Sequence, residues 1–238
     1  MSKLITISSG SIGNAYILEC QNEILLLELG IGWNDIKKAL NFDLSKVVGC
    51  LCSHEHGDHA KSVKDAIKAG IEVYSTKEVQ ALYPRVKVPK MGEKTQIGGF
   101  FIQPLEVPHS CQCLAFIIQH ESFGKMVLCT DATAFKYKIK NVNHWLIEAN
   151  YSEQILIDKM CDNSMGRSLY QHHMEIEDTV KALKVNFSAD TQNILLIHLS
   201  DGNSDEKAFV QTVKDELGFD RVYAARPNQI INLEKEEF

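Results

Sequence analysis

The sequence lacks the long apolar segments that mark membrane proteins and secreted precursors. Its 238 residues contain no run of eighteen apolar residues, so no segment is expected to span a membrane. The first six residues, 1–6 (MSKLIT), have no apolar signal-peptide core and resemble the start of a strand. These two absences predict a cytoplasmic protein.

An excess of positive charge is also missing. The formal net charge is -6, from 25 Lys and Arg against 31 Asp and Glu. Proteins that coat nucleic acid without sequence preference usually carry a basic surface, so the net charge does not suggest this class. It does not exclude nucleic acid at one local groove. The composition allows a homo-oligomer without indicating one.

The seven cysteines do not form a recognisable disulfide or zinc framework. Their number is odd and no secretion signal accompanies them, which predicts free thiols. The pairs Cys50/Cys52 and Cys111/Cys113 are separated by one residue, whereas zinc ribbons use two to four. In a strand this spacing places both thiols on one face, so we expect them to be buried as small hydrophobic residues.

Internal repeats, low-complexity tracts and Pro/Gly-rich linkers are absent too, which predicts one domain over residues 1–238. Apolar strand-like runs alternate with helical patterns, and the predicted fold class is α/β, a four-layer αββα sandwich of two sheets flanked by helices. The predicted strands are 3–8, 15–20, 23–29, 47–52, 71–75, 96–107, 113–120, 125–130, 143–149, 192–199, 220–224 and 228–233. The predicted helices are 34–41, one that ends near 69, 76–83, 151–161, 175–186 and 204–217.

The most informative segment is 53–60 (SHEHGDHA), which follows a buried-strand pattern and precedes a helix. Three imidazoles and two carboxylates therefore crowd one loop. These groups suit zinc, manganese or iron, and they would be poor neighbours without cations between them. A solvated polar loop is the alternative, but it does not explain why further candidate ligands also lie at strand ends. These candidates are His109, Asp131 and His198.

The pattern His-x-His-x-Asp-His at 54–59 resembles the signature of the metallo-β-lactamase superfamily. That family has a later His, then an Asp, then a final His, and the sequence supplies them in this order along nearly its whole length. The resemblance implies a hydrolase with two divalent ions, Zn or Mn, and a metal-bridged hydroxide as nucleophile. It also implies a division of ligands, in which one ion takes His54, His56 and His109, the other takes Asp58, His59 and His198, and Asp131 bridges.

A second segment narrows the branch of this superfamily. Residues 171–175 (QHHME) are similar to the His-containing segment of tRNA-processing phosphodiesterases and YycJ-like nucleases. His173 matches the position whose imidazole protonates a leaving alkoxide, an acid that phosphodiesters need more than β-lactams do. The alternative is a surface histidine pair before a helix. Asp58 and His173 are thus the predicted catalytic residues.

Three further segments resemble loops of the same branch: 8–14 (SSGSIGN), 148–151 (EANY) and 198–204 (HLSDGNS). Small residues in the first of them would let backbone N–H groups approach a phosphate. The predicted substrate-binding residues are Ser9, Asn14, Asn150, Ser200 and Asn203. Asn203 or Ser204 would serve equally well as the cap of the helix that follows.

Two other features are relevant to the function. Glu28 stands where the family usually has Asp, and the resemblance implies that it braces the metal loop from behind. The stretch 135–140 (FKYKIK) follows Asp131 and, if extended, places three lysines on one face. Such a strip would either track a phosphate backbone or protect an exposed edge from aggregation.

These observations predict a metal-dependent phosphodiesterase, foremost a DNA or RNA nuclease. Hydrolysis of a small phosphodiester such as a cyclic nucleotide is the alternative, followed by a thioester or lactone. Only 66 residues (132–197) separate the bridging Asp from the last His, too few for the inserted domain of β-CASP nucleases. No long Gly/Pro-rich arm for gripping tRNA is present, which argues against mature tRNA as substrate.

Overall fold

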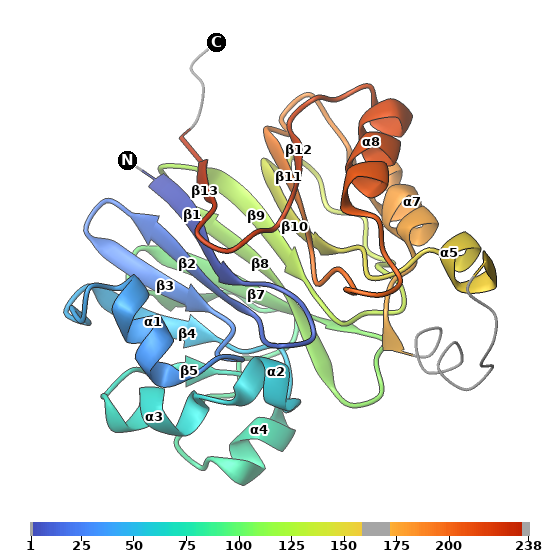
Figure 1. Cartoon of the computed structure of the whole chain (residues 1–238). Coiled ribbons are helices and arrows are strands. Elements are labelled where there is room, and N and C mark those ends of the chain that lie inside the picture. Colours follow the sequence, from blue (N-terminus) through green and yellow to red (C-terminus); the bar gives the residue numbers. More distant parts are fainter. Residues whose placement is uncertain (1, 159–171, 235–238) are drawn as a thin grey trace.

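The computed structural model describes residues 2–158 and 172–234, and these form two β-sheets that lie face to face (Figure 1). The first sheet has the order β13-β1-β2-β3-β4-β5 and the second β12-β11-β10-β9-β8-β7-β6. The strands of the first sheet are β1 (Ser2–Ser8), β2 (Ala15–Cys20), β3 (Glu23–Leu27), β4 (Val47–Leu51), β5 (Val73–Tyr74) and β13 (Ile230–Asn232). Those of the second are β6 (Thr95–Ile97), β7 (Phe100–Val107), β8 (Cys113–His120), β9 (Gly124–Cys129), β10 (His144–Glu148), β11 (Asn193–Ile197) and β12 (Val222–Ala224).

Strand burial follows from position in the sheets. β10 and β11 are buried along their whole length, because each is flanked by strands and covered on both faces. They pair in parallel, as expected for continuous apolar runs in a covered sheet. β1 instead alternates buried and partly buried residues over its first half, the pattern of a strand with one less-covered face.

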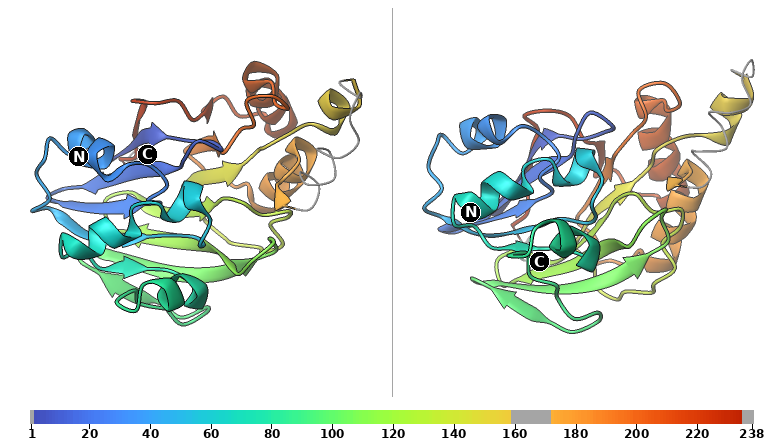
Figure 2. Two further views of the ribbon diagram at one scale, coloured as in Figure 1. Left: turned by 60° about the horizontal axis from the view of Figure 1, so that its bottom comes forward. Right: turned by 90° about the horizontal axis from the view of Figure 1, so that it is seen from below.

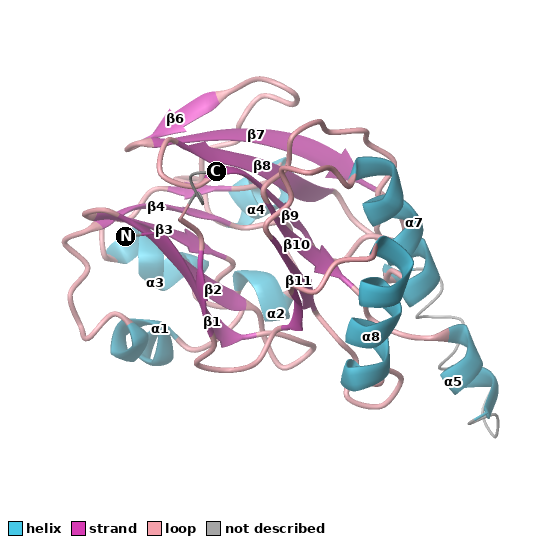
Figure 3. Ribbon diagram, turned by 90° about the horizontal axis from the view of Figure 1, so that it is seen from above, coloured by secondary structure: helices cyan, strands magenta, loops and turns pink. Residues whose placement is uncertain are grey.

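Helices cover the outer face of each sheet (Figures 2 and 3). The helices that follow strands of the first sheet in the sequence are α1 (Trp33–Ala39), α2 (Gly57–Ala60), α3 (Val63–Lys68) and α4 (Lys77–Leu82). Those that follow the second are α5 (Glu153–Asp158), α7 (Ile176–Asn186) and α8 (Glu206–Leu217). In Figure 3, α7 and α8 lie side by side against the second sheet, on the opposite side of the molecule from α1 and α3.

Three apolar clusters fill the spaces between these layers. The central cluster lies between the sheets and includes Leu18, Phe116 and Leu146. A second joins the first sheet to its helices, and a third joins β9, β10 and β11 to α7 and α8. Three cores between four layers confirm the predicted αββα sandwich.

The structure corrects several predicted boundaries. The helix expected to run from the His/Asp cluster to residue 69 is two helices, because Ser62 leaves helical geometry between α2 and α3 and its hydroxyl donates to Ile31 O. The strand expected over 96–107 is a hairpin of β6 and β7. Neither Asn203 nor Ser204 caps α8, since Asp205 accepts the hydrogen bond from Ala208 N. The predicted helix 151–161 is seen as α5, and its last three residues lie outside the described part.

Within the described residues, none of the helices has both the length and the apolar character needed to cross a membrane.

Candidate metal centre and active site

The predicted ligands meet at one end of the sandwich, where several strands finish. β4 leads into the loop that bears His54, β9 leads to Asp131 and β11 leads to His198. The turn between β7 and β8 brings His109 to the same place. Ligands of open sheets usually bind at the carboxyl ends of strands, so this location suits a functional site. We divide the cluster into two halves, called the first and second positions.

The second position consists of Asp58, His59, Asp131 and His198, whose ligand atoms lie within 4.8 Å of one another. Asp58 Oδ2 is 3.4 Å from His59 Nε2 and 3.3 Å from His198 Nε2. Asp131 Oδ1 lies 3.3 Å from the former nitrogen and 3.4 Å from the latter. Two carboxylate oxygens thus face two imidazole nitrogens around one point.

The first position contains His54, His56 and His109, together with Cys111, again within 4.8 Å of one another. His109 Nε2 is 3.3 Å from His56 Nδ1. The other oxygen of Asp131, Oδ2, lies 3.5 Å from His54 Nε2 and 3.8 Å from His109 Nε2. Asp131 therefore presents one oxygen to each position, as the predicted bridge would.

The spacing of these atoms fits divalent ions. Bonds of about 2.0–2.1 Å to nitrogen or oxygen in a tetrahedral arrangement place neighbouring ligand atoms about 3.3–3.4 Å apart. The four separations at the second position are 3.3 or 3.4 Å. The donor set of imidazole, carboxylate and one thiol suits zinc, and without its thiol also manganese.

The first position also holds an unsatisfied polar atom. His54 is buried, and its Nε2 has no hydrogen-bond partner among the residues that the structure describes. The ring centroid of His54 lies 4.5 Å from that of His56, 4.4 Å from His59 and 4.8 Å from His109. His54 and His59 are buried, and imidazoles packed this closely leave their nitrogens facing one another, which costs free energy unless a cation lies between them.

The outward-facing nitrogens are held by the protein. His59 Nδ1 lies 3.3 Å from Glu28 Oε2, and His109 Nδ1 donates to His172 O at 2.9 Å. His54 Nδ1 is 2.9 Å from the Ser53 hydroxyl. Partners of this kind fix the ring tautomer, so that the other nitrogen remains free for a metal ion.

The pKa values of the histidines reflect the same arrangement of charges. Burial lowers the pKa of His54 well below its usual range, and the neighbouring His59 adds to this effect. Burial also opposes protonation of His59, but Asp131 and Glu28 outweigh it and raise its pKa well above normal. The carboxylates around His59 thus favour positive charge at the second position, whereas His54 at the first position stays neutral.

Glu28 supports the loop from behind, as the sequence analysis predicted. Both its oxygens lie within hydrogen-bonding distance of Ser53 N, at 3.1 and 3.2 Å, and its side chain is fully buried. Gly30 allows a further close approach, because a Cβ there would lie 1.6 Å from Asp58 O. Asn14 N donates to the same Asp58 carbonyl at 2.8 Å. These contacts hold Asp58 in place through its backbone.

Three residues of the centre have left-handed backbone conformations. The φ angles are 63° at Glu28, 48° at Asp131 and 54° at His198. Each directly follows a strand or lies within two residues of its end, so the chain turns sharply there. Non-glycine residues in this region are uncommon and gather at functional sites.

His173 lies beside the second position and is anchored by a carboxylate. Its Nδ1 is 2.7 Å from Glu148 Oε1, and its ring stacks on that of His198 with centroids 5.2 Å apart. Burial lowers the pKa of His173, but the hydrogen bond and charge of Glu148 outweigh this and raise it. The side chain is 21 % exposed, so it is not part of a surface histidine pair.

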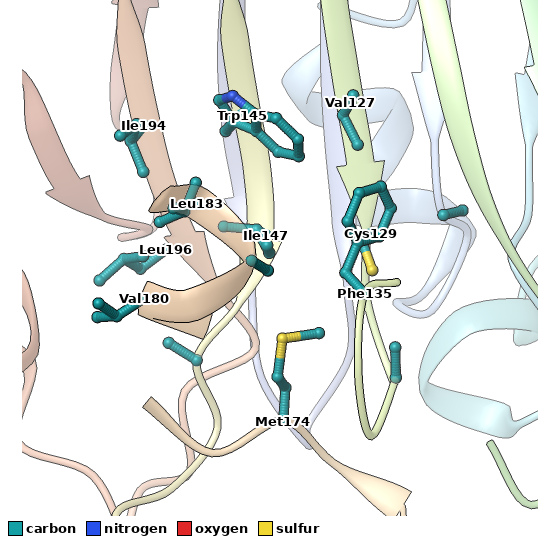
Figure 4. Close-up of a cluster of buried hydrophobic side chains, with 14 of the residues drawn as sticks. Val127, Cys129, Phe135, Trp145, Ile147, Met174, Val180, Leu183, Ile194 and Leu196 are labelled. Atoms are coloured by element: carbon teal, nitrogen blue, oxygen red, sulfur yellow. The ribbon is translucent and has the colours of Figure 1, made fainter. Parts of the chain in front are cut away.

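The position of His173 is secured by the core behind it. Figure 4 shows the neighbouring Met174 pointing into the cluster between the second sheet and α7. Its backbone N–H lies 3.3 Å from Glu148 Oε2, and its carbonyl accepts from Asn150 N. Glu148 thus holds residues 173 and 174 to the end of β10.

The five predicted substrate-binding residues have hydrogen-bond partners inside the protein, and three of them contact ligand residues of the centre. The Ser9 hydroxyl accepts from His198 N, and Asn150 Nδ2 donates to His198 O. Asn14 is fully buried beside His59. Ser200 and Asn203 hydrogen-bond to each other in the following loop. These contacts give each residue a structural role, and contact with substrate remains a prediction.

The lysine strip follows Asp131 on a segment without regular secondary structure. Lys136, Lys138 and Lys140 are exposed, whereas the intervening aromatic and aliphatic residues are less so. Figure 4 shows Phe135 turned into the core cluster, which fixes the direction of the strip. Exposed lysines thus alternate with less exposed residues, and their sharing of one face stays a prediction.

Two site residues escaped the sequence analysis. Glu148 was noted only as part of a strand end. A carboxylate at the end of an apolar strand is expected to be buried and therefore to have a hydrogen-bonding partner, which was the available signal. Cys111 was expected to be buried, but it is partly exposed and its Sγ lies 3.9 Å from His56 Nε2. Its position two residues after His109 was the available signal. The other described cysteines are buried, as expected.

Comparisons with known proteins give the following similarities. No family model matches the chain. The exodeoxyribonuclease YycJ of Bacillus anthracis is 26% identical over 235 residues, which cover 90% of this chain and 89% of the relative. The exodeoxyribonuclease WalJ of Streptococcus pneumoniae is 26% identical over 236 residues, with 90% and 88% covered.

Solved structures agree in fold. The metallo-β-lactamase fold protein YhfI from Bacillus subtilis superposes with a TM-score of 0.77 at 17% identity, over 98% of this chain and all of the other. The short form of human tRNase Z gives 0.69 at 12% identity, again over 98% of this chain and 100% of that one.

These similarities confirm three predictions: the αββα sandwich, a metal-dependent hydrolase and a resemblance to the YycJ-like branch. The chain therefore has the metallo-β-lactamase fold and is similar along nearly its whole length to exodeoxyribonucleases of the YycJ and WalJ type.

Proposed function

We propose that the chain is a dinuclear metal-dependent phosphodiesterase that degrades DNA. The observation that carries the proposal is the His173–Glu148 pair stacked beside a cluster that fits two ions. Phosphodiester hydrolysis requires a proton for its alkoxide leaving group, and a positioned imidazole can supply it. The similarity to named exodeoxyribonucleases over 90% of the chain supports DNA as the substrate.

The proposed ligands are those of the sequence analysis, with Asp131 shared between the two positions. Zinc or manganese ions there would supply Lewis acidity toward the phosphoryl oxygens and an acidified water as nucleophile. Asp58 is 24 % exposed at its side chain, so it faces both the cluster and the solvent. We assign it the orientation of the attacking water in addition to its ligand role.

His173 acts as the general acid in this proposal. Its Nδ1 proton is donated to Glu148, which leaves Nε2 to carry the proton for the leaving oxygen. Glu148 raises the pKa of this imidazole, so a larger fraction of it carries the proton at a given pH than in a free histidine. A thioester or lactone hydrolase would have little use for such an acid, since those leaving groups depart more readily.

The lysine strip supports a polymeric rather than a small substrate. It begins five residues after Asp131, and Thr133 N donates to Pro108 O, which ties the start of this segment to the His109 turn. Exposed lysines that leave an active site can neutralise successive phosphates of one strand. A cyclic nucleotide would not extend along them.

Purified protein loaded with Zn²⁺ or Mn²⁺ should cleave bis(p-nitrophenyl) phosphate and single-stranded DNA. His173→Ala should lower kcat on DNA by roughly 10²–10⁴-fold while both ions remain bound. His172→Ala is the matched control, because it keeps the backbone carbonyl that accepts from His109 Nδ1 and removes only an edge-to-face ring contact with His109 at 5.8 Å between centroids. Full activity of His173→Ala, or cleavage of lactones and thioesters alone, would contradict the proposal.

A second experiment separates polymeric from small substrates. The Lys136→Ala/Lys138→Ala double variant should raise KM for DNA and reduce its salt dependence, without changing hydrolysis of bis(p-nitrophenyl) phosphate. Lys46→Ala/Lys68→Ala is a control pair of exposed lysines at the other end of the first sheet. Faster cleavage of cyclic nucleotides than of DNA, with no effect of the strip, would favour the small-substrate alternative.

A further inference from the structure

The turn between β1 and β2 carries an exposed apolar side chain beside the second position. Ile12 is 83 % exposed, which makes it the most exposed of the large hydrophobic side chains in the described part of the chain. Single apolar residues are common on protein surfaces, so exposure alone does not indicate a binding role. The location of Ile12 distinguishes it, and the contacts on either side of the turn establish that location.

The turn is hydrogen-bonded to ligand residues at both of its ends. On one side the Ser9 hydroxyl accepts from His198 N at 2.9 Å. On the other side Asn14 Nδ2 lies 3.1 Å from His59 Nε2, the nitrogen that faces the carboxylates of the second position. Ile12 is two residues from Asn14, so their Cα atoms are at most about 7 Å apart. A nucleotide bound by its phosphate at the centre would therefore have its sugar or base near Ile12.

The turn is also held firmly in place. Gly13 N donates to Gly10 O at 3.0 Å, and Gly10 N donates to Asn14 Oδ1 at 2.9 Å. A Cβ at residue 13 would lie 2.4 Å from Gly30 O, so only glycine lets the turn pack this closely against the neighbouring loop. The backbone of Ile12 is thus ordered before any ligand binds, and little of its conformational entropy would be lost on binding.

The lysine strip and the turn lie beside different positions of the centre. Just before the strip, Thr133 N donates to Pro108 O, next to the ligand His109 of the first position, whereas the turn contacts His59 of the second. Phe135 of the strip belongs to the core between the second sheet and its helices, and the turn joins two strands of the first sheet. A DNA strand with phosphates along the lysines and its scissile phosphate at the centre would place its next nucleotide at the turn.

We propose that Ile12 packs against the base of the terminal nucleotide that the enzyme releases. The inference rests on the proposed function, because it needs a DNA strand at the centre. The sugar and phosphates of a nucleotide are polar, so the face of its base is the part that an aliphatic side chain can cover. Isoleucine is among the apolar residues that DNA-binding proteins place against bases. Such a contact involves no hydrogen bond to the base edge and therefore tolerates all four bases.

A double-mutant cycle between protein and DNA tests this contact. Full-length, metal-loaded enzyme is given a single-stranded oligonucleotide, and versions of it with one abasic nucleotide at each successive position from either end. Ile12→Ala should lower kcat/KM on the intact oligonucleotide by about tenfold, the effect expected for partial burial of an aliphatic side chain. When the released terminal nucleotide is abasic, Ile12→Ala and the unchanged protein should cleave at equal rates.

Two controls separate this contact from effects on the fold. Ile12→Leu keeps the apolar surface and should retain most of the rate on intact DNA. Ile230→Ala makes the same truncation at a 62 % exposed position on β13, a strand that carries none of the ligands, and should leave DNA cleavage unchanged. Metal analysis should find both ions in all three variants.

The possible outcomes distinguish this inference from the proposed function. A full rate of Ile12→Ala on intact DNA, or a loss that persists when the released nucleotide is abasic, would overturn the inference and leave the proposed function standing. Coupling to an abasic site only in the part of the strand that is retained would also overturn it. A metal-loaded protein that cleaves none of the oligonucleotides would overturn both.

Discussion

His144 and His198 are equally buried, at 1 % exposure each, but lie at opposite ends of the second sheet. His144 begins β10, and His198 directly follows the adjacent parallel strand β11. Burial lowers the pKa of His144 to about 4, although two backbone groups act against it. Burial also opposes protonation of His198, but Asp131, Asp58 and Glu148 outweigh it and raise its pKa to about 10.

The difference shows that the charges next to a buried imidazole, and not its burial, decide whether it favours the protonated form. At the far end Asn193 Nδ2 donates to His144 Nδ1, and the ring stays neutral as part of the core. At the site end carboxylates surround the ring and favour positive charge, which a bound cation can provide in place of a proton. Variants without the carboxylates test whether they make the site histidines favour positive charge. The acid stability of the protein tests whether His144 stays neutral.

The largest effect is expected from Asp131→Ala. The variant removes the oxygens that face both positions, so at least one ion should be lost and the phosphodiesterase rate should fall at least about 10³-fold. Metal analysis by mass spectrometry after gel filtration measures the occupancy. Asp131→Asn serves as a control of similar shape without the charge. Two ions retained in Asp131→Ala would disprove the bridging role.

A smaller loss should follow from Glu148→Gln, which keeps the shape but not the charge beside His173. Glu148 raises the pKa of His173, and the acid form is needed for catalysis. The activity falls as pH rises through this pKa, so the alkaline limb of the kcat profile should move to lower pH in the variant. We expect roughly a tenfold or greater loss at pH 8. An unchanged alkaline limb would remove Glu148 from the proposed mechanism.

Glu28→Gln should act on metal affinity alone. Glu28 fixes the tautomer of His59 from behind, so the variant should weaken the ion at the second position by roughly 10–100-fold. Competition with a fluorescent chelator measures this affinity. Glu55→Gln provides a control in the same loop and should leave it unchanged. Equal affinity in both variants would limit Glu28 to a structural role.

The smallest expected effect is on the stability of the fold in acid, and it tests the role of His144 at the start of β10. Because the pKa of His144 is lowered on folding, the unfolded chain binds a proton that the folded chain does not. Stability from this residue is complete above pH 6.5 and is lost as pH falls toward about 4. Between pH 7 and pH 5 the free energy of unfolding of the metal-free protein, measured in urea, should fall by about 2 kcal/mol more than that of the His144→Asn variant. An equal loss in both proteins would contradict the assignment.

The sequence was sufficient to predict which side chains gather at the site, because each follows an apolar strand and parallel strands finish at one edge. It could not show that Asp131 offers a different oxygen to each position, since this depends on a backbone turn after β9. The pairing of Glu148 with His173 joins residues 25 apart through Met174 and the core. The exposure of Cys111 depends on where β8 begins. Each of these arises from tertiary placement, which local patterns do not encode.

The left-handed backbone at Glu28, Asp131 and His198 carries a thermodynamic cost that the rest of the fold must offset. An L-residue in this conformation reduces the stability of the fold by about 1–2 kcal/mol relative to right-handed or extended geometry. Glycine would relieve this strain but would carry no ligand, so sequences selected for stability alone would drift away from catalysis at these three positions. Thermostable variants obtained by screening without metal should therefore tend to be inactive, and selection with metal present would protect the same residues.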